Sequence, residues 1–432
     1  MANRLARKLA QIIGEGRYPF VVAGVVFVSL LMAAGLRAAP GVLMIPLISA
    51  FGWSVRTLSL SAALGIFLYG MVGPFAAALM QRFGIRTVLL ASLLLMSLSV
   101  GVCTWMTQPW HLILAWGVLS GLGSGGVSTV LGMAIVNRWF VRRRGLVMGL
   151  LTASGATGTL IFMPGFAALV QARGWQPVVW VIAGSAAALV PLVAFLIPEH
   201  PSDAGLTAFG ADPRQHPAPP SREDPFRAAM RGLGDAARHR DFWFLFGTFF
   251  ICGFTTNGLV GTHLISFCSD RGLPEIQGAE LLAVMGIFDL VGTTLSGWLT
   301  DRFDARRLLF IYYGVRGLSL VYLAHCNFSK TELAVFSVFY GLDWVATVPP
   351  TVRLATDVFG EKAAPIVFGW VVAGHQMGAA SAAYLAGFLR SVQGSYLQSF
   401  MISGLVGVAA AFMSLAIARV KPRQGWPRAQ TT

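Results

Sequence analysis

Long apolar runs without a charged residue recur from one end of this chain to the other. Val88–Met106 and Val178–Ile197 are two of them, and a helix of about 20 such residues crosses about 30 Å of hydrocarbon. A bilayer offers no water to backbone N–H and C=O groups, so only helices or closed barrels can span it. The runs are too long and too uniformly apolar for barrel strands. The pattern predicts an all-α integral membrane protein.

Twelve such runs form two sets of six, which predicts two six-helix bundles. We expect the N-terminal bundle over residues 20–197 and the C-terminal bundle over 242–419. Residues 198–241 are rich in Pro, Arg, Asp and Ala and predict a linker, with residues 1–19 before the first span and a tail at 420–432. The first run continues past Pro40, so we interpret it as a span and not as a removed signal. The predicted spans are 20–48, 57–80, 86–106, 110–137, 143–171 and 175–197, then 242–268, 278–300, 307–326, 331–357, 363–389 and 394–419.

The charge balance is strongly basic, with 32 Lys and Arg against 18 Asp and Glu. Charged residues make up only 12% of the chain, about half the share in a soluble domain. Most of the basic residues fall in the segments that share a side with the N-terminus. The positive-inside rule therefore predicts that both termini are cytoplasmic and that the protein is multi-pass in the cytoplasmic membrane. This placement accounts for the basic excess without a nucleic-acid partner.

An internal repeat relates the two halves. The segment LMQRFGIRTVLL, beginning at Leu79, recurs as LTDRFDARRLLF, beginning at Leu299. Each copy joins the second and third predicted helix of its half. Six spans, a hydrophilic linker and six more spans, with this repeat, predict two related bundles around a central path.

These residues resemble the major facilitator superfamily, whose signature loop between helices 2 and 3 carries an Asp, an Arg and further basic residues. The segment from Trp139 to Ala153, WFVRRRGLVMGLLTA, resembles the helix 4 to 5 signature of monocarboxylate transporters and oxalate–formate antiporters. The resemblance implies alternating access, a small organic anion as cargo, and a proton or counter-anion as coupling partner. It also implies an inner latch formed by Asp301, Arg302 and Arg306, in which the acid accepts bonds from a neighbouring helix N-terminus and from basic side chains. Arg82 and Arg86 belong to the first copy, where Gln81 replaces the acid and should weaken the latch.

The first bundle contains no carboxylate, because no Asp or Glu lies between Glu15 and Glu199. A coupling carboxylate would therefore come from the second bundle, where Asp289 and Asp343 lie within spans. Ionisable groups inside a membrane are costly and functional by default. Asp289 resembles the helix 8 Asp of the monocarboxylate transporters and is expected to couple or gate, with a structural hydrogen bond as the alternative. Thr293 stands where those families carry an Arg for the substrate carboxylate.

Three further residues are expected to contact substrate together with Thr293. Arg37 lies near the family's basic position in helix 1, and its fork of donors suits a carboxylate; the alternative is an Arg that reaches the outer interface. His375 falls where oxalate–formate antiporters carry a helix 11 Lys, and the alternative is a packed neutral His. Trp344 is the third expected contact. Together with the other aromatic residues it also favours a rival function, in which the protein carries a neutral or amphipathic metabolite or drug.

Arg316 and Asp343, on predicted helices 9 and 10, either neutralise each other or take part directly in proton coupling. Pro349 and Pro350 are expected to interrupt helix 10 and free backbone carbonyls. Arg353 and Asp357 have the i, i+4 spacing of a local ion pair.

Other classes of function find little support in the sequence. Cys103, Cys252, Cys268 and Cys326 have no metal or redox spacing, although Cys268 and Cys326 could pair. The segment GLGSGG beginning at Gly121 matches a dinucleotide fingerprint, but no strand precedes it and no acid follows. Gly117, Gly121 and Gly125 instead mark one helix face for close packing. We predict a monomeric transporter with lipid around it, no catalytic residues, no metal and no cofactor.

Overall fold

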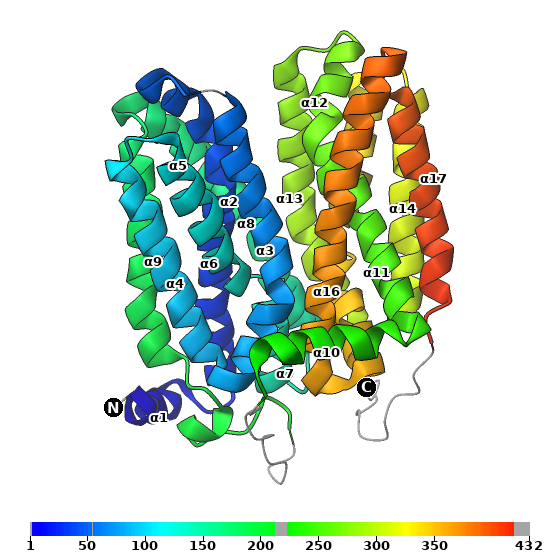
Figure 1. The fold of residues 1–432 in the computed structure, drawn as a ribbon. Coiled ribbons are helices and arrows are strands. Elements are labelled where there is room, and N and C mark those ends of the chain that lie inside the picture. The colour runs from blue at the N-terminus through cyan, green and yellow to red at the C-terminus, as the bar shows by residue number, and fades with distance from the viewer. Residues whose placement is uncertain (1, 54, 212–222, 419–432) are drawn as a thin grey trace.

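The computed structural model describes residues 2–53, 55–211 and 223–418, and within them the regular structure is helical apart from one isolated bridge between Phe140 and Phe209. The predicted tail 420–432 lies outside the described residues. Figure 1 shows two groups of upright helices side by side. We call the end with the turns at Gly84 and Asp304 the basic end, and the other end the far end.

The first group holds the helices from α2 to α9. Their bounds are α2 Tyr18–Phe51, α3 Val55–Phe83, α4 Ile85–Val102, η1 Cys103–Trp105, α5 Pro109–Leu112, η2 Ile113–Leu119, α6 Ser120–Gly126, α7 Thr129–Trp139, α8 Arg144–Arg173 and α9 Gln176–Leu196. The stretch from α5 to α7 is one apolar span, of which η2 is a π-helical turn.

The second group holds the helices from α11 to α17. Their bounds are α11 Arg240–Gly253, η4 Phe254–Val260, α12 Gly261–Asp270, α13 Glu275–Thr300, α14 Ala305–His325, α15 Lys330–Asp343, α16 Val348–Gln393 and α17 Leu397–Leu415. A π-helical turn, η4, joins α11 to α12 in one span.

Among the described residues, eleven helices are long and apolar enough to cross a membrane, against twelve predicted spans. The predicted spans 331–357 and 363–389 fall in one stretch of 64 residues, Lys330–Gln393. The boundary predicted between them, at 358–362, coincides with a break in the helix, although no loop forms there. A single residue, Gly360, breaks the helical geometry there with φ 78° and ψ 159°, a conformation that suits glycine because it has no Cβ.

The predicted small-residue face is confirmed. A Cβ added to Gly117 would lie 2.9 Å from the Ser61 carbonyl oxygen, and one added to Gly121 would lie 3.0 Å from Gly65 Cα. The third member, Gly125, faces Val72. The fourth span therefore packs on α3 at a backbone distance that larger residues would prevent.

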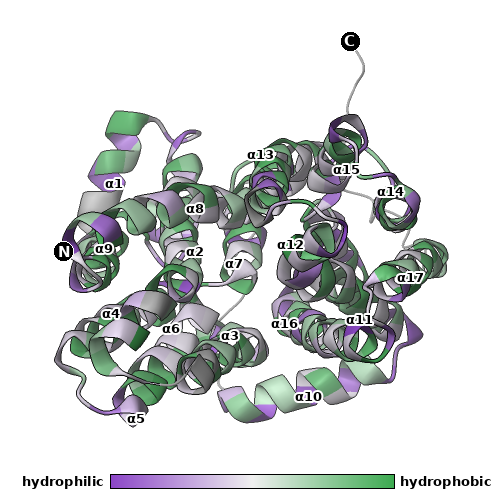
Figure 2. Ribbon diagram, turned by 90° about the horizontal axis from the view of Figure 1, so that it is seen from above, coloured by the Kyte–Doolittle hydropathy of each residue, from purple (hydrophilic) through white to green (hydrophobic). Residues whose placement is uncertain are grey.

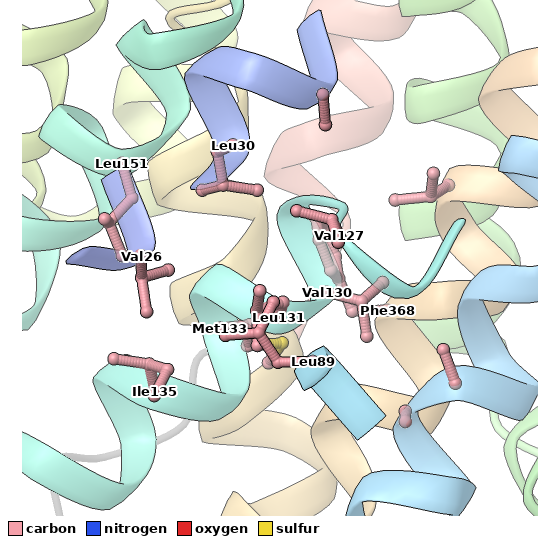
Figure 3. Packing of buried hydrophobic residues seen from close by; sticks show 14 of the residues in the cluster. Val26, Leu30, Leu89, Val127, Val130, Leu131, Met133, Ile135, Leu151 and Phe368 are labelled. Atoms are coloured by element: carbon pink, nitrogen blue, oxygen red, sulfur yellow. The ribbon is translucent and has the colours of Figure 1, made fainter. Parts of the chain in front are cut away.

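Buried apolar side chains from both groups meet near the basic end. Figure 3 shows Phe368 of α16 close to Val130 of α7, with Leu131 and Met133 beside them. Phe368, Val130, Leu131 and Met133 are each fully buried. The groups touch mainly through α8 against α13 and α3 against α16, as Figure 2 shows from above.

The predicted linker contains structure of its own. After η3, Pro201–Ala204, the helix α10, Pro225–Ala237, crosses the basic end and contacts α3 of the first group and α16 of the second. Phe226 stacks on Phe75 of α3, and Trp370 of α16 donates to the Ala229 carbonyl at 3.0 Å. A short helix, α1 Ala2–Ile13, lies at the same end against α9.

Candidate functional site

A break between α15 and α16 lies at Trp344–Thr347, which is earlier than predicted. Pro349 and Pro350 stand in the first turn of α16, where a missing N–H is tolerated. Because proline cannot donate to the carbonyl four residues before it, the Ala346 carbonyl is freed. Ser296 Oγ of α13 donates to that carbonyl at 2.5 Å. The prolines do free a carbonyl, as expected, but they begin a helix and do not interrupt one.

Arg316 and Asp343 form an ion pair beside this break. Arg316 Nε lies 2.6 Å from Asp343 Oδ2, and the two side chains are 0% and 4% exposed. Arg316 Nη2 also donates to the Trp344 carbonyl at 3.1 Å, and Nη1 to Cys252 Sγ at 2.9 Å. Asp343 Oδ1 is buried without a hydrogen-bond partner. The pair is therefore a fully desolvated charge pair with one acceptor atom unused.

Asp289 reaches the same break from α13. Its Oδ1 accepts from the Val345 N–H at 3.0 Å and from the Thr293 hydroxyl at 2.7 Å. Asp289 is 3% exposed and Thr293 is fully buried. The Thr293 hydroxyl is therefore directed at Asp289. Trp344, half-buried in the break, packs edge-on against Tyr340 with ring centroids 5.7 Å apart.

Arg37 lies in the middle of α2 and points across to α3. Its guanidinium carbon sits 4.4 Å from the centre of the Tyr69 ring, a cation–π contact. Its Nη1 is buried and has no hydrogen-bond partner. The side chain is therefore held between two helices with a donor left over.

His375 of α16 is half-buried and packs against Phe249 of α11, with ring centroids 5.1 Å apart. The next residue, Gln376, faces Gly70 of α3, where an added Cβ would lie 3.0 Å from Gln376 Cβ. Tyr69, under Arg37, precedes Gly70. Tyr69, which Arg37 contacts, and His375 are therefore the sequence neighbours of the two residues that meet, Gly70 and Gln376.

The two groups are joined at the basic end. Asp301 accepts from the Gly145 N–H at 2.7 Å and the Leu146 N–H at 3.0 Å, at the start of α8. A carboxylate at a helix N-terminus is stabilised by the unpaired amides and the helix dipole. Gln81, the counterpart of Asp301 in the first copy of the repeat, donates to the Lys362 carbonyl at 2.7 Å. Arg144 pairs with the neighbouring Glu361 at 2.7 Å.

The basic residues of the predicted latch bind elsewhere. Arg302 lies over the Trp298 ring at 3.9 Å, and Arg306 pairs with Asp304 at 2.9 Å. Arg82 approaches Asp224 of the linker at 3.8 Å, and the Arg86 amide donates to Glu199 at 3.0 Å. The predicted helix N-terminus, the start of α8, does bind Asp301. The expectation that Arg302 and Arg306 bind it as well is wrong, because Arg302 lies over Trp298 and Arg306 pairs with Asp304.

Sequence reasoning missed Glu199, which binds the Ile85 N–H at 2.8 Å and pairs with Arg138. Its signal was available, since it is the first acid after the long acid-free stretch. Burial and then the Arg138 charge lower the pKa of the neighbouring His200. Tyr69 was missed as well, and no spacing rule would have matched it to Arg37.

The predicted local ion pair and the possible disulfide have plain outcomes. Arg353 and Asp357 form the predicted local pair at 2.7 Å. The four cysteines are buried and free, so Cys268 and Cys326 are not bridged. Within the described part of the chain, no three His, Cys, Asp or Glu side chains are grouped so as to hold a metal ion.

Comparison with known proteins places the chain in a family. The model of the Major Facilitator Superfamily matches residues 25–351 and 281–432. Monocarboxylate transporter 13 of Rattus norvegicus is 28% identical over 392 residues, which cover 90% of this chain and 86% of that protein. Monocarboxylate transporter 11 of Homo sapiens is 26% identical over 419 residues, covering 95% and 85%.

Solved structures show the same fold. The E. coli fucose:proton symporter has a TM-score of 0.71 at 15% identity, covering 93% of this chain and all of that one. The human organic anion transporter MFSD10 has a TM-score of 0.66 at 15% identity, covering 92% and 99%. The chain therefore belongs to the Major Facilitator Superfamily and is a multi-pass membrane transporter related to the monocarboxylate transporters.

Proposed function

We propose that this transporter moves a small organic anion across the cytoplasmic membrane by alternating access, coupled to protons. The observation that carries the anion is Arg37, whose buried Nη1 has no partner although it lies within a span. An unpaired guanidinium donor inside a membrane is expensive. A substrate carboxylate would accept its hydrogen bond and neutralise its charge.

We further propose twelve crossings with both termini in the cytoplasm. Glu361 and Lys362 meet the first group at the basic end, whereas Arg390 binds Asp270, the last residue of α12, at the far end. The 64-residue stretch Lys330–Gln393 would then cross twice, once on each side of Gly360. The positive-inside rule assigns the basic end to the cytoplasm.

Proton coupling is assigned to Asp289, Asp343 and Arg316. With both carboxyl groups ionised, the buried group of three carries a formal charge of −1, and one added proton makes it neutral. Such a proton could bind the unused Asp343 Oδ1. It could also bind the Asp289 carboxylate, which accepts the hydrogen bond from the Val345 N–H. Protonation would weaken the hydrogen bonds of these side chains to the break between α15 and α16. The transporter would then pass more easily from one side of its cycle to the other.

The contacts at the basic end support alternating access. Asp301, Gln81 and the Arg144–Glu361 pair hold that end closed. Substrate would enter from the far end, contact Arg37 and His375, and leave when these contacts part. Trp344 would line the path beside the break. The protein is proposed to act as a monomer.

The test is reconstitution into liposomes with labelled mono- and dicarboxylates, with and without an inward proton gradient. We expect at least one monocarboxylate to accumulate, faster with the gradient. Equal uptake without the gradient would point to uniport or anion exchange and contradict the coupling. Uptake of neutral metabolites alone would contradict the anion and favour the rival function.

A further inference from the structure

The short helix α1 lies at the level where the membrane begins. It ends at Ile13, and the first apolar span starts five residues later, at Tyr18. Gly14, with φ 97°, turns the chain between the two. The Tyr18 hydroxyl donates to the Leu196 carbonyl at 3.0 Å, so the first and sixth spans reach the basic end at the same level. Because the hydrocarbon ends where the apolar spans end, α1 lies at the depth of the lipid headgroups.

The helix α1 projects from the first group. Figure 1 shows it lying crosswise at the foot of α9, and in Figure 2 it runs from α9 outwards, past the outline of the upright helices. Its contacts are mainly with α9 and η3. Ala10 is 1% exposed, and Arg7 Nε donates to the Asp203 carbonyl of η3 at 3.0 Å. A helix at headgroup depth that extends beyond the protein has lipid on the side that faces the membrane.

The side of α1 opposite Ala10 combines a positive charge with an exposed apolar side chain. Lys8 and Ile12 are each two residues from Ala10, and two residues correspond to about half a turn of an α-helix. The two side chains are therefore neighbours on that side, one turn apart. Lys8 is exposed, and Ile12 is 80% exposed, more than any other large apolar side chain in the described ranges. Water is a poor solvent for this isoleucine, whereas acyl chains are a good one.

The charge of this segment selects the kind of lipid. Residues 2–17 contain four basic residues and one acid, a net charge of +3: Arg4, Arg7, Lys8, Arg17 and Glu15. A helix with an apolar side and a basic side lies in the interface plane, where its apolar side chains enter the acyl boundary and its basic ones attract anionic headgroups. A lysine beside the apolar residue can extend its stem along the acyl boundary and keep its ammonium at the phosphates.

We infer that α1 binds the anionic phospholipids of the leaflet at the basic end, with Ile12 in the acyl boundary and Lys8 at the phosphates. The choice of the cytoplasmic leaflet rests on the proposed function, because it takes the orientation proposed there. The bond from Arg7 to the Asp203 carbonyl joins α1 to η3, and the Asp203 side chain accepts from the His200 N–H at 3.0 Å. Anionic lipid should therefore order α1 and η3 together.

Two neighbouring residues supply a matched pair of label sites. Gln11 and Ile12 are both exposed but leave the helix in directions about 100° apart. The four natural cysteines are buried, so a nitroxide can be attached to Gln11→Cys or to Ile12→Cys. Collisions of the nitroxide with oxygen, which concentrates in lipid, and with a nickel chelate, which stays in water, then report the surroundings of each position.

The experiment uses the full chain in nanodiscs of phosphatidylcholine alone or mixed equally with phosphatidylglycerol. In the mixture we expect the label at position 12 to collide mainly with oxygen and the label at position 11 mainly with nickel. In phosphatidylcholine alone the label at position 12 should shift towards nickel. Lys8→Gln should lower the ratio of lipid-bound to free α1 about fivefold in the mixture, since it removes one basic residue near the surface. Lys8→Arg should leave this ratio unchanged.

Hydrogen exchange of the wild type tests the same inference without a label. We expect the amides of α1 and η3 to exchange more slowly in the mixture than in phosphatidylcholine alone. Equal exchange in the two lipids would contradict the inference.

Three results with the labels would overturn the inference. One is mainly nickel collisions at both positions in both lipids, which would place α1 in water. Another is oxygen collisions at position 12 that are the same in both lipids and unchanged by Lys8→Gln, which would show apolar contact without anionic lipid. The third is few collisions with either reagent at position 12, which would show that protein, such as a second copy of the chain, covers Ile12. Both leaflets of a nanodisc have the same lipids and no substrate is present, so each of these results leaves the proposed transport function and orientation standing.

Discussion

Asp289 and Arg316 bind opposite sides of the same peptide group. Asp289 Oδ1 accepts from the Val345 N–H at 3.0 Å, and Arg316 Nη2 donates to the Trp344 carbonyl at 3.1 Å. Asp289 comes from α13 and Arg316 from α14, so side chains of two helices bind the break between α15 and α16. A change of charge on either side chain would therefore act directly on this break, where the backbone is not helical.

The Arg316–Asp343 pair should behave as one unit. Asp289 Oδ1 is bound by Thr293 and Val345, so loss of Asp343 removes the carboxylate that Arg316 binds directly. Breaking a buried pair in this way costs about 3–5 kcal/mol of folding free energy. We expect Asp343→Asn to destabilise the protein by that order and the double variant with Arg316→Gln to be more stable than Asp343→Asn alone. Thermal unfolding in detergent measures this, and additive effects of the two substitutions would contradict it.

Asp289→Asn should separate coupling from folding. The amide oxygen of Asn can still accept from the Val345 N–H and the Thr293 hydroxyl, so the melting temperature should change little. The side chain can no longer gain or lose a proton. We expect proton-driven accumulation to fall at least tenfold while substrate exchange across the membrane persists, as assayed in liposomes. Thr293→Val, which keeps the carboxyl group, is the control and should still accumulate substrate under a proton gradient.

Glycine contacts between α8 and α13 set how closely the basic end can shut. A Cβ at Gly149 would lie 2.7 Å from the Thr293 carbonyl oxygen, whereas one at Gly155, also on α8, meets nothing within 4 Å. Overpacking costs about 1–3 kcal/mol, so Gly149→Ala should open this end roughly tenfold more often, and Gly155→Ala should not.

Opening of the basic end can be measured by maleimide labelling of a cysteine at position 352. Val352 is buried and lines a crevice between the two groups at the basic end, so Val352→Cys should react only when that end opens. The natural cysteines are buried and serve as the background. Faster labelling in Gly149→Ala alone is the expected result. Equal labelling rates in the two glycine variants would refute the role of this contact.

Asp301 and Glu361 both join the groups at the basic end but should contribute unequally. Hydrogen bonds to a charged group contribute about 1.5–3 kcal/mol, so Asp301→Asn should slow uptake tenfold or more while leaving the protein in the membrane. The Glu361 side chain is 59% exposed, and exposed pairs contribute about 0–1 kcal/mol. Glu361→Gln should therefore transport nearly normally. Normal uptake by Asp301→Asn would contradict the role of Asp301 as a latch.

The sequence predicted the architecture because the determinants of membrane spans are local. Apolar runs, the repeat at Leu79 and Leu299 and the glycine face at Gly117 each depend on spacing along one helix. The site depends on contacts between helices. The sequence placed Asp289, Arg316 and Asp343 on three spans, but it could not show that all three converge on the break before Pro349.

Two other misses have the same physical origin. The turn at Gly360 lies inside the gap 358–362 that was predicted between two spans, but it needs only one residue with positive φ. Hydropathy and charge therefore did not show that the two helices join without a loop. The latch residues Arg302 and Arg306 carry the right charge, yet the amides of Gly145 and Leu146 satisfy Asp301. The sequence predicted that a helix N-terminus would bind Asp301, but it could not show that the two basic side chains find other partners.

The most direct test of the anion site is the affinity of Arg37→Gln for the acid that the wild type transports best, measured in liposomes beside Arg37→Lys. Loss of a charge-assisted hydrogen bond of about 1.5–3 kcal/mol predicts binding weaker by about 10- to 150-fold in Arg37→Gln. Arg37→Lys keeps the charge without the fork and should lie between Arg37→Gln and the wild type. Unchanged affinity in Arg37→Gln would contradict the account.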